Sequence, residues 1–251
     1  MENNNASGRY SENIEEVAAR TMALFYLFDR SGSMSGKKIA SVNYAMRDIP
    51  KIIMDVADSA PNANIVVAAA AFSTDVEWLT PKPQTPEEFM NNWHDITADG
   101  LTSLGAALNS LNEKMSRKAF LGDNPMGYLA PGIIILSDGE PTDDWEKPLV
   151  ELQKNNWFKS AIKIAFAVGD DANKQVLAQI CGSQEAIITI DDPEKIRSYI
   201  KFVTAAVSKT GTTSQAALGE TPQEQVINQI QSFDDDTPFV VDIPAIDDDQ
   251  W

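Results

Sequence analysis

The sequence predicts an α/β fold with a doubly wound, mostly parallel central sheet, helices on both faces and one antiparallel edge strand. Continuous apolar runs, such as residues 22–28 and 132–136, are typical of strands covered on both faces, and such strands belong to parallel sheets. Segments with apolar residues at helical spacing separate these runs, so strands and helices alternate along the chain. Acidic and hydroxyl residues follow several of the runs, at the strand ends where ligands of such sheets bind.

The first half of the chain contains a strand, a helix and a hairpin. Residues 22–28 form the first expected strand, and a glycine- and serine-rich turn leads into a helix whose pattern continues past Pro50. The apolar runs at residues 63–72 and 76–79 are separated by Ser-Thr-Asp, which is typical of a hairpin turn. The antiparallel edge strand is therefore expected here.

Alternating strands and helices fill the rest of the predicted domain. Thr85 and Glu88 have the spacing of a capping box that opens a short helix, and a further helix is expected to begin near Ser103. The remaining strands are expected at residues 132–136, 161–168 and 186–190, and the remaining helices at about 145–155, 176–180 and 193–207.

Three segments are expected along the 251 residues: an N-terminal extension (1–20), one α/β domain (21–208) and a C-terminal tail (209–251). The tail holds nine acidic residues and no basic one after Lys209, and its composition predicts a largely extended or disordered segment. A weak apolar pattern leaves room for one short helix there. That pattern consists of Val226, Ile227, Ile230 and Phe233.

Charge and composition exclude several classes of function. The formal net charge of −17 argues against nucleic acid and against an anionic membrane surface, because both require clustered lysine and arginine. No apolar stretch is long enough to span a membrane, and residues 1–8 lack the pattern of a signal peptide, so we expect a cytoplasmic protein. With only His94 and Cys181 available, a structural zinc site is excluded, and Cys181 is expected to be a buried, inert thiol.

The loop after the first expected strand brings hard oxygen donors together. Asp29, Ser31 and Ser33 form an Asp-x-Ser-x-Ser motif that places one carboxylate and two hydroxyls at the rim of the sheet. Such oxygens suit Mg²⁺, which prefers octahedral oxygen coordination and usually retains waters. The sequence therefore predicts a divalent metal, Mg²⁺ first, with Mn²⁺ and Ca²⁺ as the alternatives.

This loop resembles the metal-ion-dependent adhesion site of von Willebrand factor A (vWA) domains, which have a Rossmann-like fold. Two further loops match the pattern of that family, because Thr102 lies in Asp-Gly-Leu-Thr-Ser-Leu-Gly and Asp138 lies in Leu-Ser-Asp-Gly. The resemblance implies that Asp29, Ser31, Ser33 and Thr102 coordinate the metal, with Asp138 acting directly or through water. Leu101 stands where the family often has glycine, which bears on the shape of that loop.

The longer matches around these loops resemble the TerY branch of the family, which is named for tellurite-resistance clusters. They include Ser-Gly-Ser-Met-Ser-Gly after Arg30 and Asp-Gly-Glu-Pro-Thr-Asp-Asp after Ser137. The resemblance implies a non-enzymatic module that scaffolds a bacterial stress-response or phage-defence complex. The implied partners are a protein that supplies an acidic residue to the metal, and a protein kinase and a PP2C-type phosphatase.

Other interpretations of the same residues remain to be tested. The serines of the first loop could be helix caps, and a metal-dependent phosphohydrolase or an adaptor subunit of an AAA ATPase are the alternative functions. A phosphatase with an aspartyl nucleophile would need a second aspartate where Ser31 stands. Four further acidic residues are interpreted as helix caps rather than ligands: Asp143 and Asp144 for the helix after Trp145, and Asp170 and Asp171 for the helix that follows them.

Overall fold

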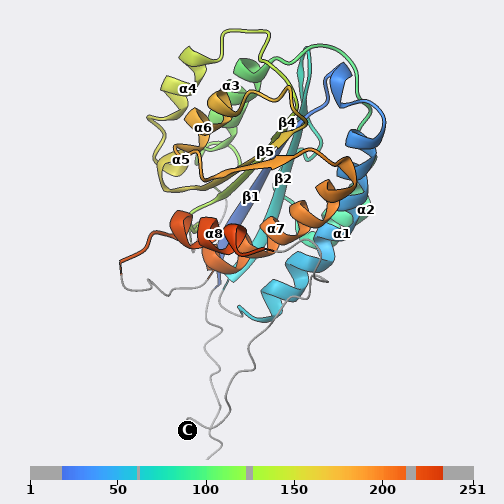
Figure 1. The fold of residues 1–251 in the computed structure, drawn as a ribbon. Coiled ribbons are helices and arrows are strands. Elements are labelled where there is room, and N and C mark those ends of the chain that lie inside the picture. The colour runs from blue at the N-terminus through green and yellow to red at the C-terminus, as the bar shows by residue number, and fades with distance from the viewer. Residues whose placement is uncertain (1–18, 61–62, 123–126, 213–218, 234–251) are drawn as a thin grey trace, which may run out of the picture.

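The computed structural model describes residues 19–60, 63–122, 127–212 and 219–233. These residues form a six-stranded sheet with helices on both faces, in the strand order β3-β2-β1-β4-β5-β6 (Figure 1). The strands are β1 (Arg20–Asp29), β2 (Ala63–Phe72), β3 (Val76–Trp78), β4 (Gly132–Ser137), β5 (Ile162–Val168) and β6 (Ile187–Ile190). All neighbouring strands are parallel except β3, which pairs antiparallel with β2 at the edge. The predicted fold class is thus confirmed.

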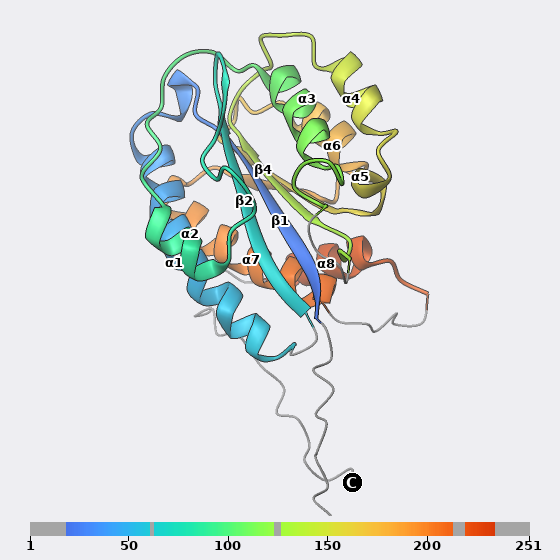
Figure 2. The same cartoon turned by 180° about the vertical axis from the view of Figure 1, so that it is seen from behind.

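The helices divide into two layers, as the views from the front and from behind show (Figures 1 and 2). One layer contains α1 (Lys37–Asp58), α2 (Pro86–Asn92) and α7 (Ile196–Thr212), in which α1 packs against both of the others. The other contains α3 (Leu104–Lys114), α4 (Glu146–Leu152), α5 (Asn156–Ser160) and α6 (Lys174–Cys181). Two short 3-10 turns, Gly32–Met34 and Pro193–Lys195, precede α1 and α7.

The central strands carry apolar residues on both faces of the sheet, because one helix layer covers each face. Every residue of β1 after Arg20 is buried, and β4 is buried throughout. Tyr26 is the one polar aromatic residue in β1, and its hydroxyl is satisfied by a hydrogen bond with Thr204 Oγ1 on α7 at 2.8 Å. Cys181 is buried as expected, and burial raises the pKa of its thiol to about 12.

Local signals in the sequence account for several element ends. Thr85 and Glu88 form the predicted capping box at the start of α2. Gly182 ends α6 in the left-handed conformation with a φ of 81°, a geometry that glycine adopts without steric cost. None of the helices among the described residues is long and apolar enough to cross a membrane.

The C-terminal part of the chain contains the one short helix for which its weak apolar pattern leaves room. Helix α7 continues to Thr212, and the weak apolar pattern beyond it forms α8 (Pro222–Gln231), which opens with a capping box at Thr221. Val226 and Ile227 are buried where α8 packs against α7 and β5. Residues 1–18, 213–218 and 234–251, on which the other expectations for the two termini fall, lie outside the described residues.

We predict that α8 contributes to the stability of the domain. Ile227 is 4% exposed, so Ile227→Ala should lower the free energy of unfolding by about 2–4 kcal/mol through lost burial and a residual cavity. Gln231→Ala, at an exposed position of the same helix, is the control and should change it by less than about 0.5 kcal/mol. Urea denaturation of the full chain measures both. Equal stability of the two variants would show that α8 is only loosely attached.

Candidate metal centre

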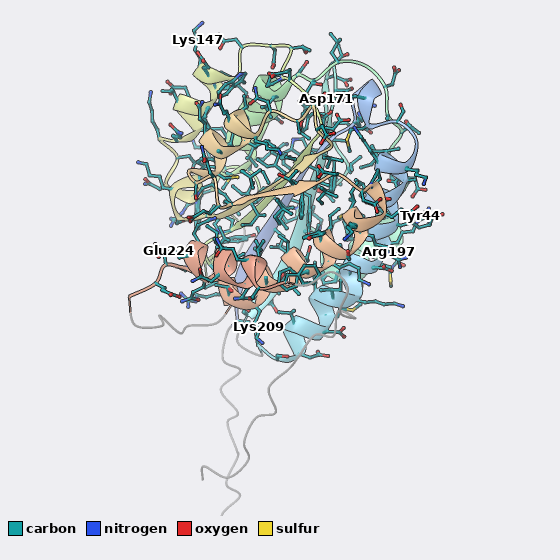
Figure 3. All side chains as sticks on the ribbon, viewed as in Figure 1. Tyr44, Lys147, Asp171, Arg197, Lys209 and Glu224 are labelled. Carbon is teal, nitrogen blue, oxygen red and sulfur yellow. The ribbon has the colours of Figure 1, made fainter. Side chains whose placement is uncertain are left out.

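The predicted site residues lie where the direction of the chain around the sheet reverses. From β1 the chain moves to β2 on one side, and it later returns to β4 on the other side of β1. Phe28 pairs with Leu136, so Asp29 and Ser137 end neighbouring parallel strands at the same edge. This is the switch point at which open α/β sheets bind ligands. Asp171, in the loop after β5, lies at this end of the molecule, whereas Glu224 of α8 lies at the other (Figure 3).

Asp29 is a fully buried carboxylate at the end of the central strand. Its Oδ1 accepts a hydrogen bond from the Ser31 amide at 2.8 Å, and its Oδ2 accepts one from the Ser137 hydroxyl at 2.7 Å. Burial raises the pKa of Asp29, the bonds from Ser137 and Ser31 lower it, and the nearby Asp138 raises it further. A cation at this place would favour the charged form of Asp29.

A chain of hydrogen bonds joins the first loop to the loop after β4. Ser33 donates its hydroxyl hydrogen to Asp138 Oδ1 at 2.7 Å, and the hydroxyl oxygens of Ser31 and Ser33 are 3.0 Å apart. Because a serine hydroxyl has a single hydrogen and Ser33 uses its own on Asp138, Ser33 can only accept from Ser31, whose hydroxyl also interacts with Asp29. Oxygen lone pairs of both serines therefore remain available to a cation.

Thr102 reaches the same place from a third loop. This loop is joined to the first one by backbone hydrogen bonds, from Gly32 N to Gly100 O at 3.1 Å and from Asp99 N to Arg30 O at 2.7 Å. The hydroxyls of Thr102 and Ser33 both lie next to Gly139, in the loop after β4. A Cβ atom added at Gly139 would be 3.7 Å from Thr102 Oγ1 and 3.9 Å from Ser33 Oγ. The structure thus brings together all five predicted residues.

The third loop accommodates Leu101 in place of the glycine that is frequent in similar loops. Gly100, with a φ of 85°, adopts the left-handed conformation next to it, and no other type of residue has a positive φ in the part of the chain that the structure describes. The Leu101 amide donates to Thr74 Oγ1 at 3.2 Å, and its side chain is 57% exposed. The shape of the loop is therefore kept without strain at Leu101.

The donor set fits a hard divalent cation. Two carboxylates and three hydroxyls converge, all of them oxygens of the kind that Mg²⁺ binds. The hydroxyl of Thr102 makes no hydrogen bond to any other described residue, so its lone pairs are available. No group of three or more His, Cys, Asp or Glu side chains arranged to hold a metal occurs among the described residues, so a cation here would depend on the hydroxyls.

Lys38, which the sequence analysis did not single out as a site residue, contacts the cluster directly. Its ammonium group donates to Asp138 Oδ2 and forms an ion pair with it. A Cβ atom added at Gly169, after β5, would lie 3.4 Å from Lys38 Nζ, so the lysine crosses the edge of the sheet from α1 to β5. No local motif marks this position, because the contact depends on how α1 lies over the strand ends. Ser137, which the predicted ligand set does not include, contacts the cluster as well, through its hydrogen bond to Asp29.

The interpretation of Asp143 as a cap of α4 is wrong, whereas Asp144 interacts with the backbone of Glu146 and Lys147 in the first turn of that helix. Trp145 is the N-cap of α4 and makes no capping bond through its side chain. The Asp143 carboxylate instead accepts hydrogen bonds from Gly105 N at 2.9 Å and Ala106 N at 3.0 Å, so it caps α3. Asp144 is exposed and pairs with Lys147 at 2.9 Å. Asp143 therefore anchors the loop that carries Asp138 to the helix that follows Thr102.

The capping role predicted for Asp170 and Asp171 is wrong as well. Asn173 caps α6, since its side chain accepts a hydrogen bond from Val176 N at 3.0 Å. The Nδ2 group of Asn173 also donates to Glu140 at 2.7 Å, which links the loop after β4 to the start of α6. An asparagine nearer to the first turn thus takes the place that the two aspartates were expected to fill.

Comparisons with known proteins identify the fold. The sequence profile described as von Willebrand factor type A domain matches residues 24–202. The search of curated proteins found no match. Among solved structures, a von Willebrand factor type A protein from Catenulispora acidiphila is similar with a TM-score of 0.58, 16% identity and coverage of 76% of this chain and 43% of that one.

Two further solved structures share the fold. Proximal thread matrix protein 1 from the mussel byssus has a TM-score of 0.58 and 19% identity, and the match covers 76% of this chain and 49% of that one. It was solved with zinc in its metal-ion-dependent adhesion site (MIDAS) motif. The pilus adhesin SpaC from Lactobacillus rhamnosus GG has a TM-score of 0.58 and 12% identity, covering 77% and 31%. The chain spans less than half of each of these three solved chains.

We predict that Asp143, and not its neighbour Asp144, holds the site together. Asp143→Ala removes two hydrogen bonds to the start of α3 and should lower the free energy of unfolding by about 1–3 kcal/mol. Asp144→Ala removes an exposed ion pair and bonds within the first turn of α4, and should lower the free energy of unfolding by less than Asp143→Ala does. Thermal unfolding of both variants is the measurement. A larger loss in Asp144→Ala would contradict the anchoring role.

Proposed function

The chain belongs to the von Willebrand factor type A domain family, and from that premise we propose that it is a non-enzymatic, metal-dependent protein-interaction module. The observation that supports this proposal is the convergence of oxygen donors from three loops at the rim of the sheet. The site is open on one side, because Ser33 is exposed while Asp29 and Thr102 are buried. A group from another protein can therefore approach the donors.

We propose that Asp29, Ser31, Ser33 and Thr102 hold the cation and that Asp138 acts directly or through water. Mg²⁺ is the expected ion, with Mn²⁺ and Ca²⁺ as alternatives, because the donors are hard oxygens and few of them are charged. The zinc in the adhesion-site motif of the mussel protein supports metal binding by this type of motif.

The proposed partner is a protein that presents an aspartate or glutamate. A bound divalent cation would supply an electrophilic centre that an incoming carboxylate can coordinate. Asp29 and Asp138 provide at most two negative charges, and Lys38 offsets one of them, so the cation would remain attractive to an anion. Binding of the partner is therefore expected to require the metal.

The matches to the TerY branch support a more specific role. We propose that the chain scaffolds a cytoplasmic bacterial stress-response or phage-defence complex with a protein kinase and a PP2C-type phosphatase. The sequence segments around Ser33 and Asp138 that resemble this branch are those that build the site. An adaptor subunit of an AAA ATPase would use the same surface, so the identity of the co-purifying partner distinguishes the two roles.

Thr102 provides a sharp test of the metal site. Thr102→Ala should weaken Mn²⁺ binding about tenfold or more, because it removes one neutral oxygen donor that makes no other hydrogen bond. Ser103→Ala is the control, since the adjacent hydroxyl bonds to Thr74 O at 3.3 Å and is not part of the cluster. Isothermal titration calorimetry with Mn²⁺ and Mg²⁺ measures both variants. Unchanged affinity in Thr102→Ala would contradict the proposed ligand set.

Removal of the metal should abolish partner binding without unfolding the domain. The full chain should retain a co-expressed kinase or phosphatase in Mg²⁺ and release it in EDTA, because the carboxylate contact depends on the cation. The same samples should not hydrolyse p-nitrophenyl phosphate. Metal-stimulated hydrolysis that is lost in Asp29→Ala would contradict the proposed binding function and would indicate a metal-dependent phosphohydrolase.

A further inference from the structure

We propose that the positive charge of Lys38 tunes the metal site. It lowers the affinity of the site for the metal and raises the affinity of the metal-loaded site for a carboxylate. This inference rests on the proposed function, because it concerns how the same site is tuned. It assigns a role to a residue outside the five oxygen ligands. Lys38 acts through Asp138, because it positions that carboxylate and offsets its negative charge.

The contacts of Asp138 carry the argument. Its side chain is fully buried, and both of its oxygens have partners, Ser33 at Oδ1 and Lys38 at Oδ2. A buried ion pair has a strong effect on its surroundings, because water does not screen it. The Lys38 side chain is 26% exposed, and its ammonium group reaches the carboxylate from the side of β5. Lys38 and a bound cation would therefore compete for the negative charge of Asp138.

The charges of the cluster determine the direction of both effects. Asp29 and Asp138 contribute two negative charges and Lys38 one positive charge, so the cluster carries a net charge of about −1 before metal binding and about +1 with a divalent cation. Without Lys38 the same values would be about −2 and 0. Loss of Lys38 should therefore favour the cation and disfavour an incoming carboxylate. Lys38 thus lowers the affinity for the metal and increases the selectivity of the metal-loaded site for an acidic partner.

The neighbouring Lys37 supplies a matched control. It precedes Lys38 on α1, its side chain is 76% exposed, and it pairs with Glu194 at 3.1 Å on the surface. Lys37→Met and Lys38→Met remove the same charge and the same hydrogen-bonding group from adjacent positions. Only Lys38→Met removes the contact with Asp138. A difference between these two variants therefore reports on that contact and not on net charge.

The experiment compares the two variants with the unmodified full chain. Lys38→Met should bind Mn²⁺ about tenfold more tightly than Lys37→Met by isothermal titration calorimetry. In EDTA it should unfold at a lower temperature than Lys37→Met, and saturating Mn²⁺ should reduce that difference, because the cation replaces the lost charge. At saturating Mn²⁺, acetate should bind Lys38→Met about threefold more weakly, as measured by water-proton relaxation.

The outcomes separate this inference from the proposed function. If the unmodified chain binds Mn²⁺ and both lysine variants bind it equally, the inference on Lys38 is overturned and the interaction module stands. If the unmodified chain does not bind Mn²⁺, the proposed function fails as well. Should Lys38→Met not fold, Lys38→Gln, which keeps a hydrogen-bond donor without the charge, takes its place in the same comparison, and equal affinities again overturn the inference.

Discussion

The site depends on the burial of one carboxylate at the end of the central strand. A charged group removed from water is costly unless each of its oxygens is satisfied. Asp29 meets this requirement by accepting one hydrogen bond from its own loop, at Ser31, and one from the neighbouring strand, at Ser137. Satisfying Asp29 therefore fixes the loops after β1 and β4 relative to each other. The contact between Ser33 and Asp138 follows from that placement.

The loop that carries Thr102 is held by a separate set of hydrogen bonds, so all three loops of the site are fixed relative to one another. Backbone hydrogen bonds join it to the first loop, and Asp143 joins the loop after β4 to the helix that follows Thr102. The fit at this joint is close, because a Cβ atom added at Gly105 would lie 2.2 Å from the backbone oxygen of Asp144. Binding energy is then not spent on ordering the donors, which is the advantage of a preorganised site.

Local patterns in the sequence were sufficient for the central strands, and together with the family resemblance they pointed to five residues that the structure brings together, but they did not predict contacts made across the fold. Continuous apolar runs mark buried strands, and four of the five residues lie at or just after the ends of two of those strands, while Thr102 precedes α3. Asp143 was misassigned because the start of α4 is near in sequence, whereas its partners on α3 lie 38 and 37 residues earlier. The ion pair of Lys38 spans 100 residues and has no local signature. Helix α8 was expected only as a short helix in an acidic tail, because its packing on α7 and β5 is also a long-range property.

Local charges, and not the net charge, decide what the site attracts. A net charge of −17 would by itself repel an acidic partner, yet charges separated by more than about 8 Å are largely screened at physiological ionic strength. Glu224 of α8 lies at the other end of the molecule from Asp171 in the loop after β5 (Figure 3). The groups that act most strongly on a carboxylate approaching the site are therefore those of the cluster and the acidic residues at the same end of the molecule, such as Asp171. Because Asp138 faces Lys38, its negative charge is offset inside the protein. With a divalent cation bound, the cluster would carry a net positive charge, and an acidic protein could then recognise an acidic partner at this site.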